Sequence, residues 1–163
     1  MKAIHFLLLP AVCLLSACTQ KEMQSEKNRQ AALASVHAFE KADLAAMKHF
    51  CAPGFIDYGN GESKPVNNLD SMKVAMDAFY AAFPDQKVTN LQAFSSGDTV
   101  VVTDTRTGTF KQPLMGIKPN GKHYNYRDVE ILVFNKDGLI ISHQAIQSDR
   151  TIFGQLGITP PGN

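Results

Sequence analysis

The stretch HYNYRDVEILVFNKDGLIISHQAIQSD, residues 123–149, decides the fold class of this chain. Two runs rich in β-branched and aromatic residues flank the turn NKDG, which is the pattern of two antiparallel strands joined by a short loop. Two further strand-like runs, KVTNLQAF and TVVVTDTRTGTF, precede it and are joined by the turn SSGD. The second half of the chain is therefore predicted to form a mainly antiparallel sheet.

The first half of the chain has helical spacing instead. Apolar residues recur at intervals of three and four over residues 33–50, which predicts two consecutive helices, with Asp43 as the cap of the second. The motif CAPGF ends that helix and FIDYG follows as a short strand, before a third helix over residues 69–83. Helices followed by hairpin-connected strands predict an α+β domain, with the helices packed on one face of a curved sheet of four to six strands.

The N-terminus has the anatomy of an export signal. Lys2 supplies a positive charge, and the apolar run AIHFLLLPAVCLL that follows is too short to span a bilayer as a mature helix. The motif LSAC then resembles the bacterial lipobox, which implies that Cys18 carries lipid after cleavage. The mature protein would be anchored to a membrane of the bacterial cell envelope, on its periplasmic or surface side. An ordinary secretory signal cut after Ala17 is the alternative.

The chain is predicted to have four parts. The segment TQKEMQSEKNRQ has a single apolar side chain and cannot bury enough surface to order itself, so it is interpreted as a flexible tether. The predicted parts are a signal peptide at 1–17, the tether at 18–29, one α+β domain at 30–158 and a C-terminal tail at 159–163.

Charge and cysteine content exclude several classes of function. Loss of the leader removes Lys2 and leaves 15 basic against 15 acidic residues, and a neutral surface without a basic cluster disfavours a nucleic-acid partner.

Cys13 leaves with the leader and Cys18 is predicted to carry lipid, so Cys51 has no disulfide partner and nothing beside it marks an activated thiolate. The remaining histidines lack metal-ligand spacing, so neither a metal nor a cofactor is predicted. These are His37, His49 and His123.

Six segments, in this order and spacing, resemble the SnoaL-like polyketide and ester cyclases of the nuclear-transport-factor-2-like superfamily. They are AAFPDQKV, SSGDTVVV, GTF, GIKPNGK, FNKDGLI and GQLG. The resemblance covers about residues 30–158 and implies a cone-shaped α+β barrel, with an apolar pocket for a small hydrophobic ligand or substrate between helices and sheet. It also implies a homodimer through the outer face of the sheet as a candidate assembly. In these cyclases an acidic side chain, helped by a histidine, acts as acid and base in an aldol closure.

The candidate acid/base residues lie on the last two predicted strands. His143 and Asp149 are six positions apart, an even spacing that predicts one face of the final strand, and Asp128 and Glu130 share a face of the strand before it. A carboxylate and a histidine are the groups needed to move a proton next to a carbonyl. His143, Asp149 and Asp128 are therefore predicted to be catalytic, with Glu130 in the pocket.

The chain departs from the cyclase pattern after the histidine. The cyclases carry a tryptophan directly after it and an acid about five residues beyond, whereas Gln144 and Ser148 occupy those positions here. Asp149 has a second interpretation as the cap of a short helix that opens at Thr151.

The register of the hairpin leaves two arrangements open. A loop of two or four residues would place His143 beside even-numbered residues of the preceding strand, whereas a three-residue loop with Gly138 in a left-handed bulge would place it beside the odd-numbered ones. The even set is Tyr124, Tyr126, Asp128 and Glu130, and the odd set is Arg127, Val129, Ile131 and Val133. His143 is predicted to face the interior, because the residues of its parity, Leu139, Ile141 and Ala145, are apolar.

A buried histidine needs a partner, and Asp128, Glu130 and Tyr58 are the predicted candidates. The predicted pocket also includes Tyr58 at its mouth and the helical stripe of Met76, Phe79 and Tyr80. Two functions remain open at this stage. One is an ester cyclase or related acid/base enzyme acting on a small hydrophobic carbonyl compound. The other is a non-catalytic module that binds a small molecule or interacts within the envelope.

Overall fold

The computed structural model of the protein describes residues 9–62 and 64–159. Its five-stranded sheet has the order β1-β5-β4-β3-β2, in which only the β1–β5 pair is parallel. The strands are β1 Cys51–Asp57, β2 Lys87–Ser96, β3 Thr99–Thr109, β4 His123–Phe134 and β5 Ile140–Ala145. The predicted α+β fold with a curved, mainly antiparallel sheet is confirmed.

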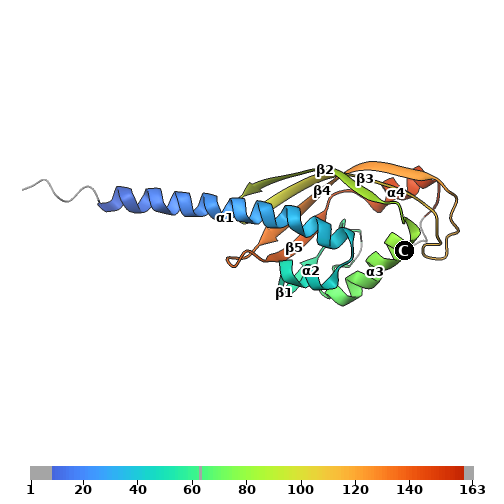
Figure 1. Ribbon diagram of the computed structural model, residues 1–163, viewed down its shortest axis with the longest axis horizontal. Helices are drawn as coiled ribbons and strands as arrows, with labels where there is room; N and C mark the ends of the chain where they lie inside the picture. The colour runs from blue at the N-terminus through green and yellow to red at the C-terminus, as the bar shows by residue number, and fades with distance from the viewer. Residues whose placement is uncertain (1–8, 63, 160–163) are drawn as a thin grey trace, which may run out of the picture.

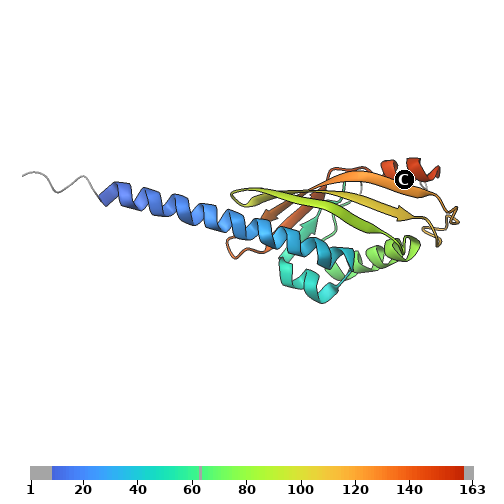
Figure 2. The same cartoon turned by 45° about the horizontal axis from the view of Figure 1, so that its top comes forward.

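Three helices cover one side of this sheet, as Figures 1 and 2 show. They are α1 Leu9–Glu40, α2 Leu44–Phe50 and α3 Leu69–Ala82, and a fourth, α4 Asp149–Leu156, follows the last strand. The predicted cap of α2 is confirmed, because the side chain of Asp43 accepts a hydrogen bond from the amide of Ala46. Asn68 caps α3 and Ser148 caps α4 in the same way. The helices therefore begin where short polar side chains satisfy their free amides.

The first strand begins earlier than the sequence indicated. The predicted strand was FIDYG, but β1 starts at Cys51 and includes Pro53 and Gly54. Proline is compatible with this position because β1 is an edge strand, where a missing backbone donor breaks no ladder bond on the open side.

The segment predicted as a tether, residues 18–29, lies within α1 in the structure. At its C-terminal end the chain is ordered, because Asn28 is buried and donates a hydrogen bond to the carbonyl of Gly97 in the β2–β3 turn. The N-terminal part of α1 projects beyond the sheet (Figure 1). Residues 1–8 of the predicted signal peptide and 160–163 of the predicted tail lie outside the described residues. None of the described helices is long and apolar enough to cross a membrane.

The β4–β5 hairpin has the three-residue loop with Gly138 in the left-handed region, yet a bulge in β5 gives the pairing that was predicted for the other loop lengths. Leu132 pairs with His143, and Glu130 pairs with Ala145, so His143 lies beside the even-numbered residues of β4. An irregularity between Val133 and Phe134 leaves Ile141 as one extra residue in β5, and its side chain is 40% exposed. His143 does face the interior, as predicted. The argument from its parity with Ile141 was nevertheless wrong, because the bulge reverses the parity within the strand.

Asp149 does not lie on the final strand. β5 ends at Ala145, and Asp149 is the first residue of α4. The prediction that His143 and Asp149 share a strand face is therefore wrong, because even spacing carries a face relation only while the chain stays extended. The alternative that Asp149 caps the helix is also corrected, since the hydroxyl of Ser148 accepts the hydrogen bond from the amide of Arg150.

The apolar core has two clusters at opposite ends of the cone. One joins α1 and β1 to the sheet, with Val36, Phe55 and Val100 among its buried members. The other joins α3 and α4 to the sheet around Phe83 and Tyr124. Polar side chains of the inner sheet face lie between α1 and α3, and this is where the candidate site is found.

Candidate functional site

A cavity of about 310 Å³ lies between α1, α3 and the inner face of the sheet, and we call it the inner cavity. Its wall combines apolar side chains from the helices with ionisable side chains from the strands. The lining residues are Ser35, Val36, Phe39, Glu40, Asp57, Met72, Met76, Tyr80, Arg106, Glu130, Leu132, His143 and Asp149. Its volume lies at the lower end of the range typical of small-molecule sites.

His143 is held in this cavity by Asp57. The parallel pairing of β1 with β5 places the two residues opposite each other, and the Nδ1 atom of His143 lies 2.9 Å from Oδ1 of Asp57. The other ring nitrogen, Nε2, lies 3.9 Å from a carboxylate oxygen of Glu130. A carboxylate on Nδ1 fixes the orientation of the ring and leaves Nε2 directed at the cavity.

The surroundings of His143 favour its protonated form. Burial alone would lower the pKa of this histidine, but the hydrogen bond to Asp57 and the charge of Glu130 outweigh burial, so its pKa lies above the usual value. His143 is therefore a stronger base than a free imidazole, held in place by a carboxylate.

A buried ionic cluster stands next to the histidine. Arg106 lies on the inner face of β3, with its Nε and Nη2 atoms 3.2 and 3.1 Å from the carboxylate of Asp104. Its Nε atom is 3.3 Å from Asp128, and its Nη2 atom bonds Glu130. Asp104 and Asp128 are 2% and 4% exposed. Three carboxylates thus surround one guanidinium, and two of them are almost completely buried.

The crowding of carboxylates changes their protonation. Burial raises the pKa of Asp128 to about 6, although the charge of Arg106 opposes this shift. Burial likewise raises the pKa of Asp104. One guanidinium does not neutralise all three acids, so the cluster carries an excess of negative charge or holds a proton near neutral pH.

The structure brings most of the predicted site residues together, but not all. Glu130, Met76 and Tyr80 line the inner cavity with His143, as does Asp149 from the start of α4. Asp128 does not line the cavity, and it contacts Arg106 rather than His143. Phe79 lines a neighbouring cavity instead.

Tyr58 is not a partner of the histidine ring. Its side chain is 43% exposed and does not line the inner cavity, and only its backbone N–H bonds the carbonyl oxygen of His143. The prediction that Tyr58 lies in the pocket is therefore wrong. Its strand leads past the cavity, but the side chain that enters from this strand is the preceding one, Asp57.

Two central residues, Asp57 and Arg106, were not predicted. The partner of His143 comes from 86 positions away, through a parallel strand pairing that no local pattern reveals. For Arg106 a local indication exists in TVVVTDTRTGTF. The positions that face inward begin with Val100 and Val102 and then change to Asp104 and Arg106, which is an acid and a base on one otherwise apolar strand face.

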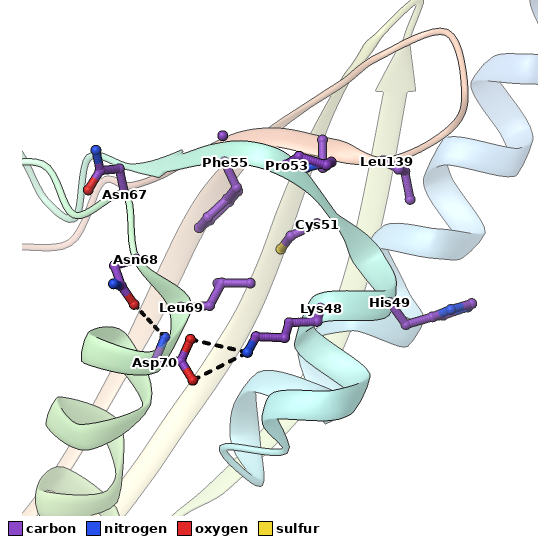
Figure 3. A pocket seen from close by; sticks show the side chains of 12 residues that line it. Lys48, His49, Cys51, Pro53, Phe55, Asn67, Asn68, Leu69, Asp70 and Leu139 are labelled. Carbon is purple, nitrogen blue, oxygen red and sulfur yellow. Dashed lines mark hydrogen bonds and ion pairs between the residues drawn. The ribbon is translucent and has the colours of Figure 1, made fainter.

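A larger cavity, of about 550 Å³, lies at the free edge of β1, and we call it the edge groove. Figure 3 shows Lys48 reaching across it to the carboxylate of Asp70, with Nζ–Oδ distances of 3.1 and 3.2 Å. The sulfur of Cys51 points into the space between strand and helices. Burial raises the pKa of this thiol to about 12, so it supplies no thiolate at neutral pH. The edge groove lacks an activated group.

Comparison with protein families identifies one match. A family model described as SnoaL-like polyketide cyclase matches residues 29–156. No curated protein matches the chain.

Solved structures give a consistent fold. AclR from Streptomyces galilaeus, provisionally assigned as a hydroxylase, is 26% identical with a TM-score of 0.68, over 84% of this chain and 89% of that one. A provisionally assigned SnoaL-like polyketide cyclase from Jannaschia sp. CCS1 is 19% identical with a TM-score of 0.73, over 83% and 95% of the two chains. IdmH from Streptomyces antibioticus, a provisionally assigned polyketide cyclase, is 22% identical with a TM-score of 0.66, over 80% and 99%.

Proposed function

The chain belongs to the SnoaL-like polyketide cyclase family, and on this premise we propose that it is an acid/base enzyme acting on a small, neutral, hydrophobic carbonyl compound. The observation that carries the proposal is the pair of His143 and Asp57, which leaves Nε2 of the histidine directed into the inner cavity beside Glu130. The reaction would be proton removal next to a carbonyl, as in an aldol ring closure.

The proposed step assigns a role to each group. Nε2 of His143 accepts the proton from the carbon next to the carbonyl, and the electron pair of that bond moves to the carbonyl oxygen to form an enolate. Asp57 stabilises the imidazolium that results. In a ring closure, the enolate carbon would then attack a second carbonyl carbon, and the imidazolium would return its proton to the new alkoxide.

The enolate oxygen needs a hydrogen-bond donor, and Arg106 is the candidate. Within the described part of the chain, the carboxylates contact Nε and Nη2 of Arg106, so Nη1 is the nitrogen left for a ligand oxygen. The three carboxylates around it also disfavour an anionic substrate. Val36, Phe39 and Met72 supply the apolar part of the wall, which supports a hydrophobic substrate.

The test is α-proton exchange into a neutral ketone. Tetralone, a bicyclic ketone, would be incubated with the enzyme in deuterated buffer, and deuterium incorporation followed by NMR. Replacing His143 with Gln should lower the enzyme-dependent exchange rate by about 100-fold or more, which is the usual contribution of a general base. The matched control is His49→Gln, which changes a histidine of the edge groove and should leave the rate unchanged. Equal rates in wild type and His143→Gln would refute the proposal.

A second candidate function is interaction through the outer face of the sheet, including a homodimer. Phe94, Ile141 and Ile146 lie there with 60%, 40% and 54% of their surfaces exposed, and exposed apolar groups of this kind favour a protein partner. The test is the mass in solution by sedimentation. Wild type should sediment as a dimer and Phe94→Glu as a monomer, whereas a monomeric wild type would rule out the homodimer.

We also propose that the protein is exported and lipid-anchored through Cys18. The support is the motif LSAC after a charged apolar leader, and several acyl chains anchor a protein more stably than one. Cys18→Ser should abolish labelling by a fatty-acid analogue and release the protein from the membrane fraction. A wild type that takes up no label would contradict the anchor.

A further inference from the structure

A second cavity of about 400 Å³ lies next to the inner cavity, and we call it the outer cavity. It is enclosed by α3, α4 and the loop between β3 and β4. Ala75, Ala78 and Phe79 line it from α3, Leu114 and Met115 from the loop, and Ile152 from α4. These side chains are apolar, and Asp149, which the outer cavity shares with the inner one, is the ionisable side chain in its wall.

The two cavities share walls. α3 presents Met76 and Tyr80 to the inner cavity and the neighbouring positions Ala75 and Phe79 to the outer one. Asp149, the first residue of α4, lines both cavities. Asp149 therefore lies where the two cavities adjoin, and a ligand long enough to reach both would have to pass this residue.

The outer cavity also has an unusual rim. Met115 is 68% exposed and its φ angle is 50°, a left-handed conformation that is costly for a residue with a side chain. On the opposite wall, Ala75 and Ala78 expose only methyl groups, which leaves open the space that larger residues on α3 would fill. A large apolar side chain held at the mouth of an apolar cavity is a surface that an apolar ligand would cover.

We infer that the substrate is bipartite, with a neutral carbonyl end in the inner cavity and an apolar body, long enough to pass Asp149, in the outer cavity. The inference rests on the proposed function only for the carbonyl end of the substrate, which would react in the inner cavity. The inner cavity alone is at the lower limit for a small-molecule site, whereas the two together reach the middle of the range. The outer cavity would select substrates by length and apolar surface without taking part in the chemistry.

The test uses methyl ketones of increasing chain length, namely butanone, methyl butyl ketone, methyl hexyl ketone and methyl octyl ketone. Their dissociation constants would be measured by calorimetry or NMR titration with the full chain. Burial of each added methylene should strengthen binding by up to about fourfold, up to the longest member. Ala78→Phe fills the outer cavity and should end this gain beyond the middle of the series, while butanone binds as in wild type.

The matched control is Ala81→Phe. Ala81 is also exposed on α3, but it lies on the helix face turned away from Met72 and lines neither cavity. Met115→Asp is a second test variant, which places a charge at the rim and should also weaken only the long ketones. It decides the question if Ala78→Phe does not fold.

The outcomes separate this inference from the proposed function. All titrations are repeated in the His143→Gln background, where proton transfer is absent but both cavities remain. A length-dependent gain that Ala78→Phe or Met115→Asp removes and Ala81→Phe keeps supports the bipartite site, whether or not the wild type catalyses exchange. The inference is overturned if affinity does not rise with chain length, or if the cavity variants and the control retain the same gain. Exchange activity that depends on His143 would in that case leave the proposed function standing.

Discussion

The inner cavity and the edge groove are two hollows that each contain an ion pair, yet they differ in what their charges can do. The edge groove is the larger, at about 550 Å³ against 310 Å³. Its pair, Lys48 and Asp70, has side chains that are 52% and 64% exposed. In the inner cavity, the paired side chains of Arg106 and Glu130 are 24% and 12% exposed.

This difference teaches that burial, rather than volume, decides how strongly charged neighbours affect one another. Water screens the charges of the edge groove, so its ion pair contributes little to stability. In the inner cavity the effective dielectric is low, so each carboxylate alters the protonation of its neighbours. Asp57 and Glu130 raise the pKa of His143 despite its burial, and burial raises the pKa of Asp128, which lies beside Arg106 outside the cavity wall.

The largest expected effect follows from removing the central cation. Arg106→Met leaves Asp104, Asp128 and Glu130 buried without their partner, which should lower the free energy of unfolding at neutral pH by about 3–5 kcal/mol. Urea denaturation followed by circular dichroism measures this loss. A loss below about 1 kcal/mol, which is typical of an exposed ion pair, would show that burial does not strengthen the ion pairs of Arg106.

The next effect concerns the carboxylate that holds the histidine. Asp57→Asn removes the negative charge beside Nδ1 of His143 and should slow ketone α-proton exchange by about 100-fold. The pKa of His143 should also fall, so the rate should reach its plateau at lower pH than in wild type. The pH–rate profile tests both, with Asp70→Asn in the edge groove as the control. An unchanged pH–rate profile in Asp57→Asn would show that Asp57 has no role in the proposed proton transfer.

A third effect depends on pH. The pKa of Asp128 in the folded protein, about 6, is above its unfolded value, so the stabilisation of the protonated form is complete below the unfolded pKa and is lost as pH rises through 6. Asn is neutral at every pH. As pH rises from acidic to mildly alkaline, Asp128→Asn should therefore gain stability relative to wild type, by about 3 kcal/mol.

Thermal unfolding of wild type and Asp128→Asn across this pH range tests the prediction. Asp137→Asn is the matched control, since Asp137 lies in the exposed turn between β4 and β5. Parallel stability curves for wild type and Asp128→Asn would show that burial of this carboxyl does not shift its protonation.

The smallest effect is expected in the edge groove. Lys48→Met breaks the exposed pair with Asp70 and should change the free energy of unfolding by less than about 1 kcal/mol, with no change in exchange rate. The same urea and exchange assays apply. A strong loss of exchange activity in Lys48→Met would indicate that the active site lies in the edge groove and not in the inner cavity.

Much of the fold was predictable because its causes are local. Alternation in TVVVTDTRTGTF and the three-and-four spacing before residue 50 report which faces are buried, and Asp43 marks a helix start by its own side chain. The inward position of His143 was predicted correctly, although through a parity that the bulge at Ile141 breaks. A single inserted residue is a tertiary adjustment that the sequence does not announce.

What the sequence by itself determined is the class of fold and the common face of Asp128 and Glu130, since periodicity along an unbroken strand is enough to place two of its residues relative to each other. Only the tertiary structure decided which groups meet. The partner of His143 is Asp57, from a strand 86 residues away that joins the sheet in parallel, and Asp149 reaches both cavities from a helix rather than from the strand. Such contacts depend on how distant segments close over one another, and burial then sets the charges that the residues carry.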